Sequence, residues 1–184
     1  MILLNESYEI EITKDTQYTL FSTDNKFYNH AFQMEEYTRN DYVSAYSVSV
    51  HSLITDYKIA IIGRGYGSIE NCAVLEGDRL VILIDDYLVS FDLITQNLEW
   101  KIKVIDFGTG IEIYAFDNGY IVNGEVDIIK VDKLGNKIWS FSGRDIWVRP
   151  NGESSTNIQI GSLLLIDFEG YEYLLDKWGK EILK

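Results

Sequence analysis

The second half of the chain repeats a pattern of short strands and tight turns about every forty residues. Three aspartates mark the copies, since Asp92, Asp132 and Asp176 lie 40 and 44 residues apart. Two tryptophans, Trp100 and Trp139, lie 39 residues apart. A repeat of this length is one supersecondary unit, which buries its apolar face against a neighbouring copy. The repeat therefore predicts a stack of similar units.

Each copy is expected to hold up to four strands. We expect them at residues 72–75, 80–84, 87–91 and 98–100, then at 111–116, 120–123, 126–131 and 138–139, and finally at 158–160, 163–166, 171–175 and 181–183. Turns such as Gly77-Asp78 and Asp117-Asn118-Gly119 separate them, and these residue types adopt the positive φ angles that tight hairpins require. A four-stranded meander every forty-odd residues is typical of one β-propeller blade.

Residues 1–71 lack this repeat but also favour strands. Glu9 to Ile12 and Tyr46 to Val50 alternate apolar and polar residues, the period of a half-buried strand. The best helical segment, Ala31 to Tyr42, is short and rich in poor helix formers. We expect one all-β domain over residues 1–184. It would consist of an N-terminal β region (1–71) and about three antiparallel, four-stranded, blade-like meanders (72–184). A closed four-bladed propeller is the alternative, because 184 residues allow at most four blades of about 42 residues.

The first two copies end in similar segments, residues 91–100 and 131–139, each with an aspartate, a turn and a closing tryptophan. These endings resemble those of the PQQ-like (quinoprotein) β-propeller repeats. Asn97 replaces the family's glycine in the first copy, and the third copy has Leu183 at the tryptophan position and Trp178 inside the turn. The resemblance covers residues 72–184 and implies blade-like sheets. It does not imply a quinone, since nothing matches a cofactor cage or a vicinal cysteine pair, and we expect no cofactor.

The chain carries 29 acidic and 16 basic residues, a formal net charge of −13. Such a surface repels nucleic acid and anionic lipids, so we expect neither as a partner. No apolar run approaches the roughly 18 residues of a membrane span. The N-terminus lacks the basic start and cleavage site of a signal peptide, and the single cysteine, Cys72, cannot form an internal disulfide. These features predict a cytoplasmic protein. Uncovered edge strands would allow homo-oligomers.

A glycine-rich loop, Gly63-Arg64-Gly65-Tyr66-Gly67, follows an apolar strand and looks like a phosphate-binding loop. Phosphate loops need a following helix whose amides meet the anion, and here a strand-like segment follows. We therefore expect no nucleotide, and a mobile, exposed turn that carries Arg64 and Tyr66. His30 and His51 lack the spacing of metal ligands, so we expect no metal site. The sequence contains no motif of a catalytic nucleophile, so we expect no catalytic residue. Cys72 is expected to be a core thiol.

The partner-binding candidates come from turns and from the segment that joins the second and third copies. They are Asp85, Asp86, Arg64, Tyr66, Arg144 and Trp147. Residues 80–129 hold nine acids and two lysines, so an acidic rim is expected there. Tryptophan and arginine are common interface anchors, although Trp147 could instead plug the gap between two sheets.

The expected function is binding of another protein without catalysis, as when an acidic immunity protein neutralises a basic partner. The alternative is an enzyme that processes a small molecule or a glycoside with carboxylates in a cleft between sheets.

Overall fold

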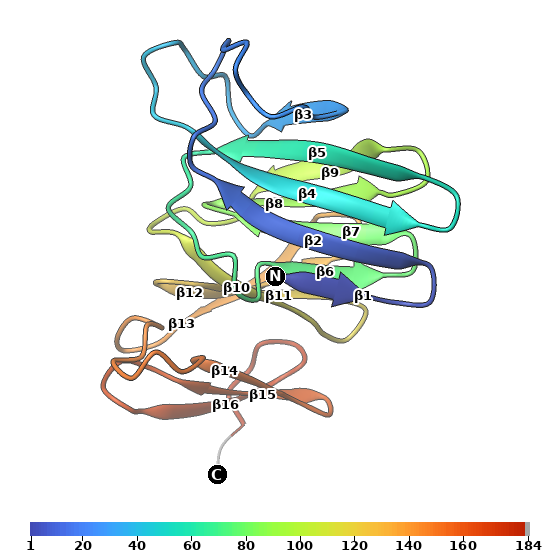
Figure 1. Cartoon of the computed structure of the whole chain (residues 1–184). Coiled ribbons are helices and arrows are strands. Elements are labelled where there is room, and N and C mark those ends of the chain that lie inside the picture. The colour runs from blue at the N-terminus through green and yellow to red at the C-terminus, as the bar shows by residue number, and fades with distance from the viewer. Residues whose placement is uncertain (183–184) are drawn as a thin grey trace.

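A computed structural model describes residues 1–182, and these fold into sixteen strands in four sheets, without a helix (Figure 1). The all-β prediction is confirmed. The N-terminal sheet has the order β1 (Ile2–Leu4), β2 (Tyr8–Asp15), β4 (Ser44–Ser52), β5 (Asp56–Gly63) and β3 (His30–Gln33). The first blade contains β6 (Ala73–Glu76), β7 (Arg79–Ile84), β8 (Tyr87–Asp92) and β9 (Asn97–Lys103). The second blade contains β10 (Gly110–Ala115), β11 (Gly119–Gly124), β12 (Asp127–Asp132) and β13 (Lys137–Ser142). The third blade contains β14 (Thr156–Gln159), β15 (Ser162–Ile166) and β16 (Glu172–Asp176).

The three blades are antiparallel meanders with the predicted strands. The third has three strands and an isolated bridge between Leu175 and Glu181, where the fourth was expected. Leu183, expected at its tryptophan position, lies outside the described residues. Strand pairing keeps the same register in each blade, because Arg79, Gly119 and Ser162 pair with Asp92, Asp132 and Asp176. The repeat read from the sequence is therefore a structural repeat.

The N-terminal sheet differs from a blade. Its strands β2, β4 and β5 are antiparallel, whereas β3 pairs with β5 in parallel. The segment 31–42 is not helical, since it contributes the end of β3 and then turns. The connections on either side of β3 fold over the outer face of β4 and β5, where Leu20, Tyr37 and Val43 pack on Ala45 and Ile62. A cover of this kind shields part of the sheet from solvent.

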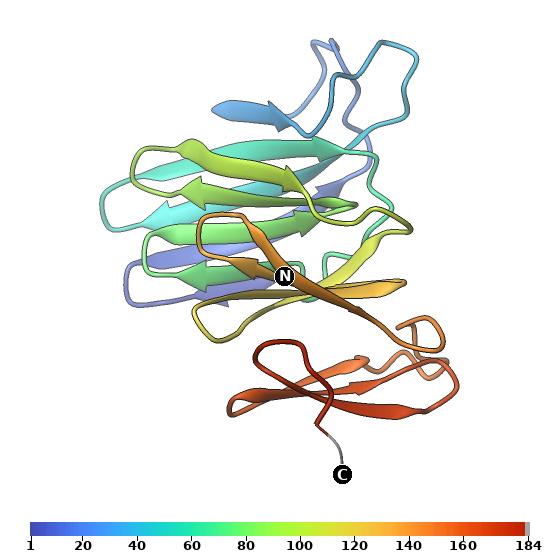
Figure 2. The ribbon, with the colours of Figure 1, turned by 180° about the vertical axis from the view of Figure 1, so that it is seen from behind.

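The sheets follow one another in a row from the N-terminal sheet to the third blade, as Figures 1 and 2 show from opposite sides. In the first and second blades, alternation along the strands points one set of side chains at the preceding sheet and the other set at the next. In β7, Leu80 and Ile82 pack toward the N-terminal sheet, and Val81 and Leu83 pack toward the second blade. Within residues 1–182, no hydrophobic cluster joins the N-terminal sheet to the third blade, so these residues do not close into a propeller.

The two repeated tryptophans make the same contact, as the repeat predicts. The Trp100 indole donates a hydrogen bond to the Lys133 carbonyl oxygen at 3.2 Å, and the Trp139 indole donates to the Lys177 carbonyl oxygen at 3.1 Å. Each ring thus packs on the turn that follows the repeat aspartate of the next blade. Both rings are half-buried, because each lies on the last strand of its blade.

Candidate functional site

The backbone amides of the glycine-rich loop surround the side-chain carboxylate of Asp85. One carboxylate oxygen of Asp85 accepts the backbone N–H groups of Arg64 and Gly65, at 2.7 and 3.0 Å. The other accepts those of Tyr66 and Gly67, at 2.6 and 3.3 Å. Gly65 has a φ of +74°, which helps turn successive amides toward one point. The loop therefore has the amide arrangement of an anion nest, and Asp85 fills it.

This arrangement corrects the expected place of Asp85. Its side chain is 6% exposed and engaged by four donors, so it is not a surface contact on an acidic rim. Asp85 lies 18 to 21 residues after the loop, at the turn between β7 and β8. Sequence spacing did not pair the two segments, because only sheet packing brings them together. The same pairing ties the loop down, whereas we expected a mobile turn.

Arg64, Tyr66 and Asp86 lie near Asp85 around a cavity of about 120 Å³. The Arg64 guanidinium is 3.6 Å from Glu35 and lies over the Tyr37 ring at 5.7 Å. Burial is the largest cause that raises the pKa of the Tyr37 hydroxyl, with the Glu35 carboxylate next. The Asp86 carboxylate pairs with the Lys103 ammonium at 2.8 Å. Of this group, Tyr66 is the most freely presented side chain, at 67% exposed.

Trp147 lies between the second and third blades. Its side chain is 1% exposed, and its indole donates to the Val126 carbonyl oxygen at 2.9 Å. The ring meets Tyr173 edge-on, with the centroids 5.5 Å apart, and so fills the space between the second and third blades. This position is the plug that the sequence allowed as an alternative to an interface anchor. Arg144 is exposed and lies over the Tyr171 ring at 4.0 Å.

The acids of the expected rim are engaged by partners within the chain. All nine acids between residues 80 and 129 accept a hydrogen bond or pair with a base. Four of them pair with a base: Asp86 with Lys103, Glu99 with Arg79, Asp106 with Lys137 and Asp117 with Lys177. The other five accept hydrogen bonds: Asp85 from the loop amides, Asp92 from Thr95, Glu112 from Asn123, Glu125 from Thr109 and Asp127 from Ser142. The ion pairs therefore compensate the charge of four acids, whereas the hydrogen bonds hold the other five carboxylates in place without removing their charge.

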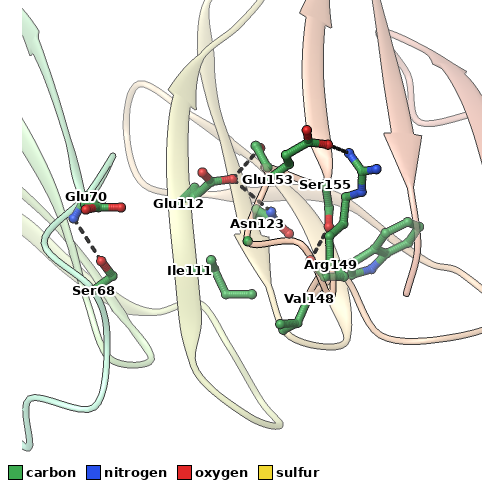
Figure 3. Close-up of a pocket in the computed structure, with 12 residues that line it drawn as sticks. Ser68, Glu70, Ile111, Glu112, Asn123, Val148, Arg149, Glu153 and Ser155 are labelled. Atoms are coloured by element: carbon green, nitrogen blue, oxygen red, sulfur yellow. Dashed lines mark hydrogen bonds and ion pairs between the residues drawn. The ribbon is translucent and has the colours of Figure 1, made fainter. Parts of the chain in front are cut away.

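A cavity of about 170 Å³ opens between the second and third blades, close to Trp147 (Figure 3). We call it the interblade cavity, and its polar lining consists chiefly of Glu70, Glu112, Asn123, Arg149, Glu153 and Ser155. The sequence did not single out the glutamates and the asparagine among these residues, because they come from three distant segments.

Glu112 and Asn123 are the buried polar pair of the interblade cavity. Glu112 is 9% exposed, lies at a register shift in β10, and accepts hydrogen bonds from the side-chain amides of Asn71 at 3.1 Å and Asn123 at 3.2 Å and from the Ser154 hydroxyl. Asn123 is fully buried, and its carbonyl oxygen Oδ1 accepts no hydrogen bond from any described residue. Arg149 pairs with Glu153 at 2.6 Å. Glu112 and Asn123 therefore have acceptor positions that the described residues leave unused.

The described residues also bear on metal binding, thiol chemistry and membrane spans. No group of three or more His, Cys, Asp or Glu side chains within residues 1–182 is arranged to hold a metal ion. Burial raises the pKa of the Cys72 thiol to about 12, and the side chain is 1% exposed, as expected for a core thiol. The described part of the chain also contains no helix that is long and apolar enough to cross a membrane.

Comparison with known proteins gives a likeness of fold. No protein-family model and no curated protein matches the chain. The Kuenenia stuttgartiensis hydrazine synthase matches with a TM-score of 0.52 and 14% identity, over 90% of this chain and 51% of that one. The dihydro-heme d1 dehydrogenase NirN matches with a TM-score of 0.51 and 13% identity, over 80% of this chain and 36% of that one. The computationally designed Ika4 protein has a TM-score of 0.50 and 8% identity, over 86% of this chain and 95% of its own. This chain thus spans about half of the hydrazine synthase chain and a smaller part of the NirN chain. Its fold is similar to that of β-propeller-type proteins.

Proposed function

We propose that this protein binds a basic protein partner without catalysis, in the manner of an immunity protein that neutralises its target. The formal net charge of −13 is the reason to propose a positively charged partner. An acidic protein attracts a basic one over several ångströms and so raises the rate of encounter. Nucleic acid and anionic membranes are disfavoured by the same charge.

The outer face of the N-terminal sheet is the observation that carries the proposal. Strand pairing sets Ile2 opposite Glu11 and Leu4 opposite Glu9, so the four side chains share one face. All four are exposed, Ile2 by 62% and Leu4 by 69%. Among the described residues, neither glutamate has a side-chain hydrogen bond or an ion pair. Aliphatic side chains beside unpaired carboxylates suit a partner that presents basic and apolar residues together.

The test is the association rate of a partner recovered by pull-down from native lysate. We expect the rate to fall steeply between low and physiological salt, because exposed charges are screened. The double variant Glu9→Gln and Glu11→Gln should slow association by roughly tenfold at low salt and flatten the salt dependence. The double variant Glu36→Gln and Glu169→Gln, at two other exposed acids, is the matched control and should leave the rate unchanged.

A rate that responds neither to salt nor to the two substitutions would refute the proposal. The acidity would then serve solubility alone. Loss of association in the control variant to the same extent would also refute the assignment to this face, because the effect would then come from net charge.

The proposal also covers the compartment, the repeat family and self-association. We place the protein in the cytoplasm, which suits its unpaired, buried Cys72. We assign the blades to divergent PQQ-like repeats, supported by the matching contacts of Trp100 and Trp139. Self-association would use β1, an edge strand of the N-terminal sheet.

An enzyme with carboxylates in a cleft between sheets is the weaker alternative. The interblade cavity does hold several acids, but Glu112 is bound by three donors and Glu153 by Arg149. Glycoside chemistry requires one carboxyl group to protonate the leaving group and a second to act as a base or nucleophile. Engaged carboxylates serve these roles poorly, which favours binding over catalysis.

A further inference from the structure

The interblade cavity contains acceptor atoms that could receive further hydrogen bonds. The Asn123 Oδ1 atom is buried and accepts nothing from residues 1–182, although a carbonyl oxygen has two lone pairs. A buried acceptor left without a donor loses the hydrogen bonds that it made to water in the unfolded chain, so such atoms usually meet water or a ligand. Glu112 accepts three hydrogen bonds, and a carboxylate has about four acceptor positions. Both residues can therefore accept from one more donor group.

The charge of the cavity favours a cation as that donor group. Glu70, Glu112 and Glu153 line it, and Arg149 is the single basic residue in its lining. Arg149 is already paired with Glu153. Glu112 has hydrogen bonds but no ion pair with a described base, and a buried carboxylate is stabilised strongly by a positive charge. A neutral donor would satisfy Asn123 and leave this charge uncompensated.

The shape and walls favour a planar cation over a compact one. Figure 3 shows Glu112 and Asn123 in the middle of the view, with Ile111 below Glu112, and Arg149 and Ser155 on the side away from Ser68 and Glu70. Trp147 also lines the space. A guanidinium donates along two edges at once and tolerates contact with aliphatic and aromatic walls, whereas an ammonium is compact and strongly hydrated. The volume of about 170 Å³ exceeds that of several water molecules.

We propose that the interblade cavity is a binding site for a guanidinium group, which Glu112 and Asn123 hold by their acceptor oxygens. The ligand is an arginine side chain or a small guanidinium compound. The site is separate from the outer face of the N-terminal sheet and does not depend on the function proposed for that face.

The test titrates the full chain with Nα-acetyl-arginine methylamide and records the indole N–H resonance of Trp147 by NMR. Nα-acetyl-citrulline methylamide is the matched probe, because its side chain has nearly the same shape and no charge. We expect saturable shifts with the arginine probe and at least tenfold weaker binding of the citrulline probe. A primary amine, Nα-acetyl-lysine methylamide, should also bind at least tenfold more weakly. Agmatine, a free guanidinium compound, separates the two sources: tighter binding than the arginine probe points to a small molecule, and weaker binding to a peptide.

Variants locate the site. Glu112→Gln should weaken the arginine probe at least tenfold, and Glu169→Gln, an exposed acid of the third blade, should not. Equal binding of the arginine and citrulline probes by the unaltered protein would overturn the proposal, even if Glu112→Gln fails to fold. So would binding that survives Glu112→Gln, or equal binding of the lysine probe. No Trp147 shift at millimolar probe would mean that the cavity holds water only, and it would overturn the proposal as well.

Discussion

Replacing Asp85 with asparagine removes the negative charge at the centre of the glycine loop and leaves the turn intact. Asp85 has a φ of +53°, and asparagine tolerates this left-handed conformation as well as aspartate does. The new side chain keeps one acceptor oxygen, which can serve two of the four loop amides. Its NH₂ group would face the other two amides, donor against donor.

The expected cost follows from the bonds that are lost. Two hydrogen bonds to a charged acceptor disappear, each worth about 1.5–3 kcal/mol in a buried setting. We therefore expect Asp85→Asn to lower the free energy of unfolding by about 3–6 kcal/mol. The neighbouring Asp86→Asn is the control: its carboxylate lies at the surface, in a pair with a half-exposed lysine, and its loss should cost less than about 1 kcal/mol.

Urea unfolding followed by tryptophan fluorescence measures both values, provided that the dependence of stability on denaturant is unchanged. The reasoning fails if Asp85→Asn costs no more than Asp86→Asn. That result would mean that water replaces the carboxylate at the loop amides without loss.

Three further predictions concern the blades. Gly135→Ala should lower the free energy of unfolding in urea by about 1–2 kcal/mol more than Gly161→Ala does. Both glycines have positive φ, but only a Cβ at Gly135 would meet the Trp100 ring, at 2.9 Å. Equal losses of stability would show that the Trp100 contact does not restrict this position. Burial lowers the pKa of the Lys130 ammonium to about 8. The unfolded chain therefore binds more protons between pH 8 and 10, so stability should rise over this range by on the order of 2 kcal/mol relative to Lys130→Met; parallel pH profiles would contradict this. Cys72, with its pKa raised to about 12, should react with a thiol reagent in urea but not in the native protein, and rapid native labelling would place it outside the core.

Local patterns were enough to predict the blades. Turn residues with positive φ, such as Asn118 and Gly161, sit between apolar runs of strand length, so each hairpin is encoded within a few residues. The contact of Trp100 with the next blade also follows from the repeat, because equivalent positions face equivalent neighbours.

The site residues could not be read in the same way. Asp85 looked like a surface turn residue, and its burial depends on a loop about twenty residues earlier. Glu112, Asn123 and Ser154 meet only after two blades have packed, and their spacing in the chain carries no motif. The parallel pairing of β3 with β5 likewise depends on a long connection that has no periodic pattern.

The row of sheets has a consequence for how the protein loses its structure. Each inner blade contacts a sheet on both faces, whereas in the described chain the third blade has one packed face, through Leu163, Leu165 and Leu175. In such a linear array stability approximates a sum of nearest-neighbour terms, so opening can begin at one end and spread. Backbone amides of β15 should therefore exchange with deuterium sooner than those of β7, because the third blade can open locally while the other sheets stay folded.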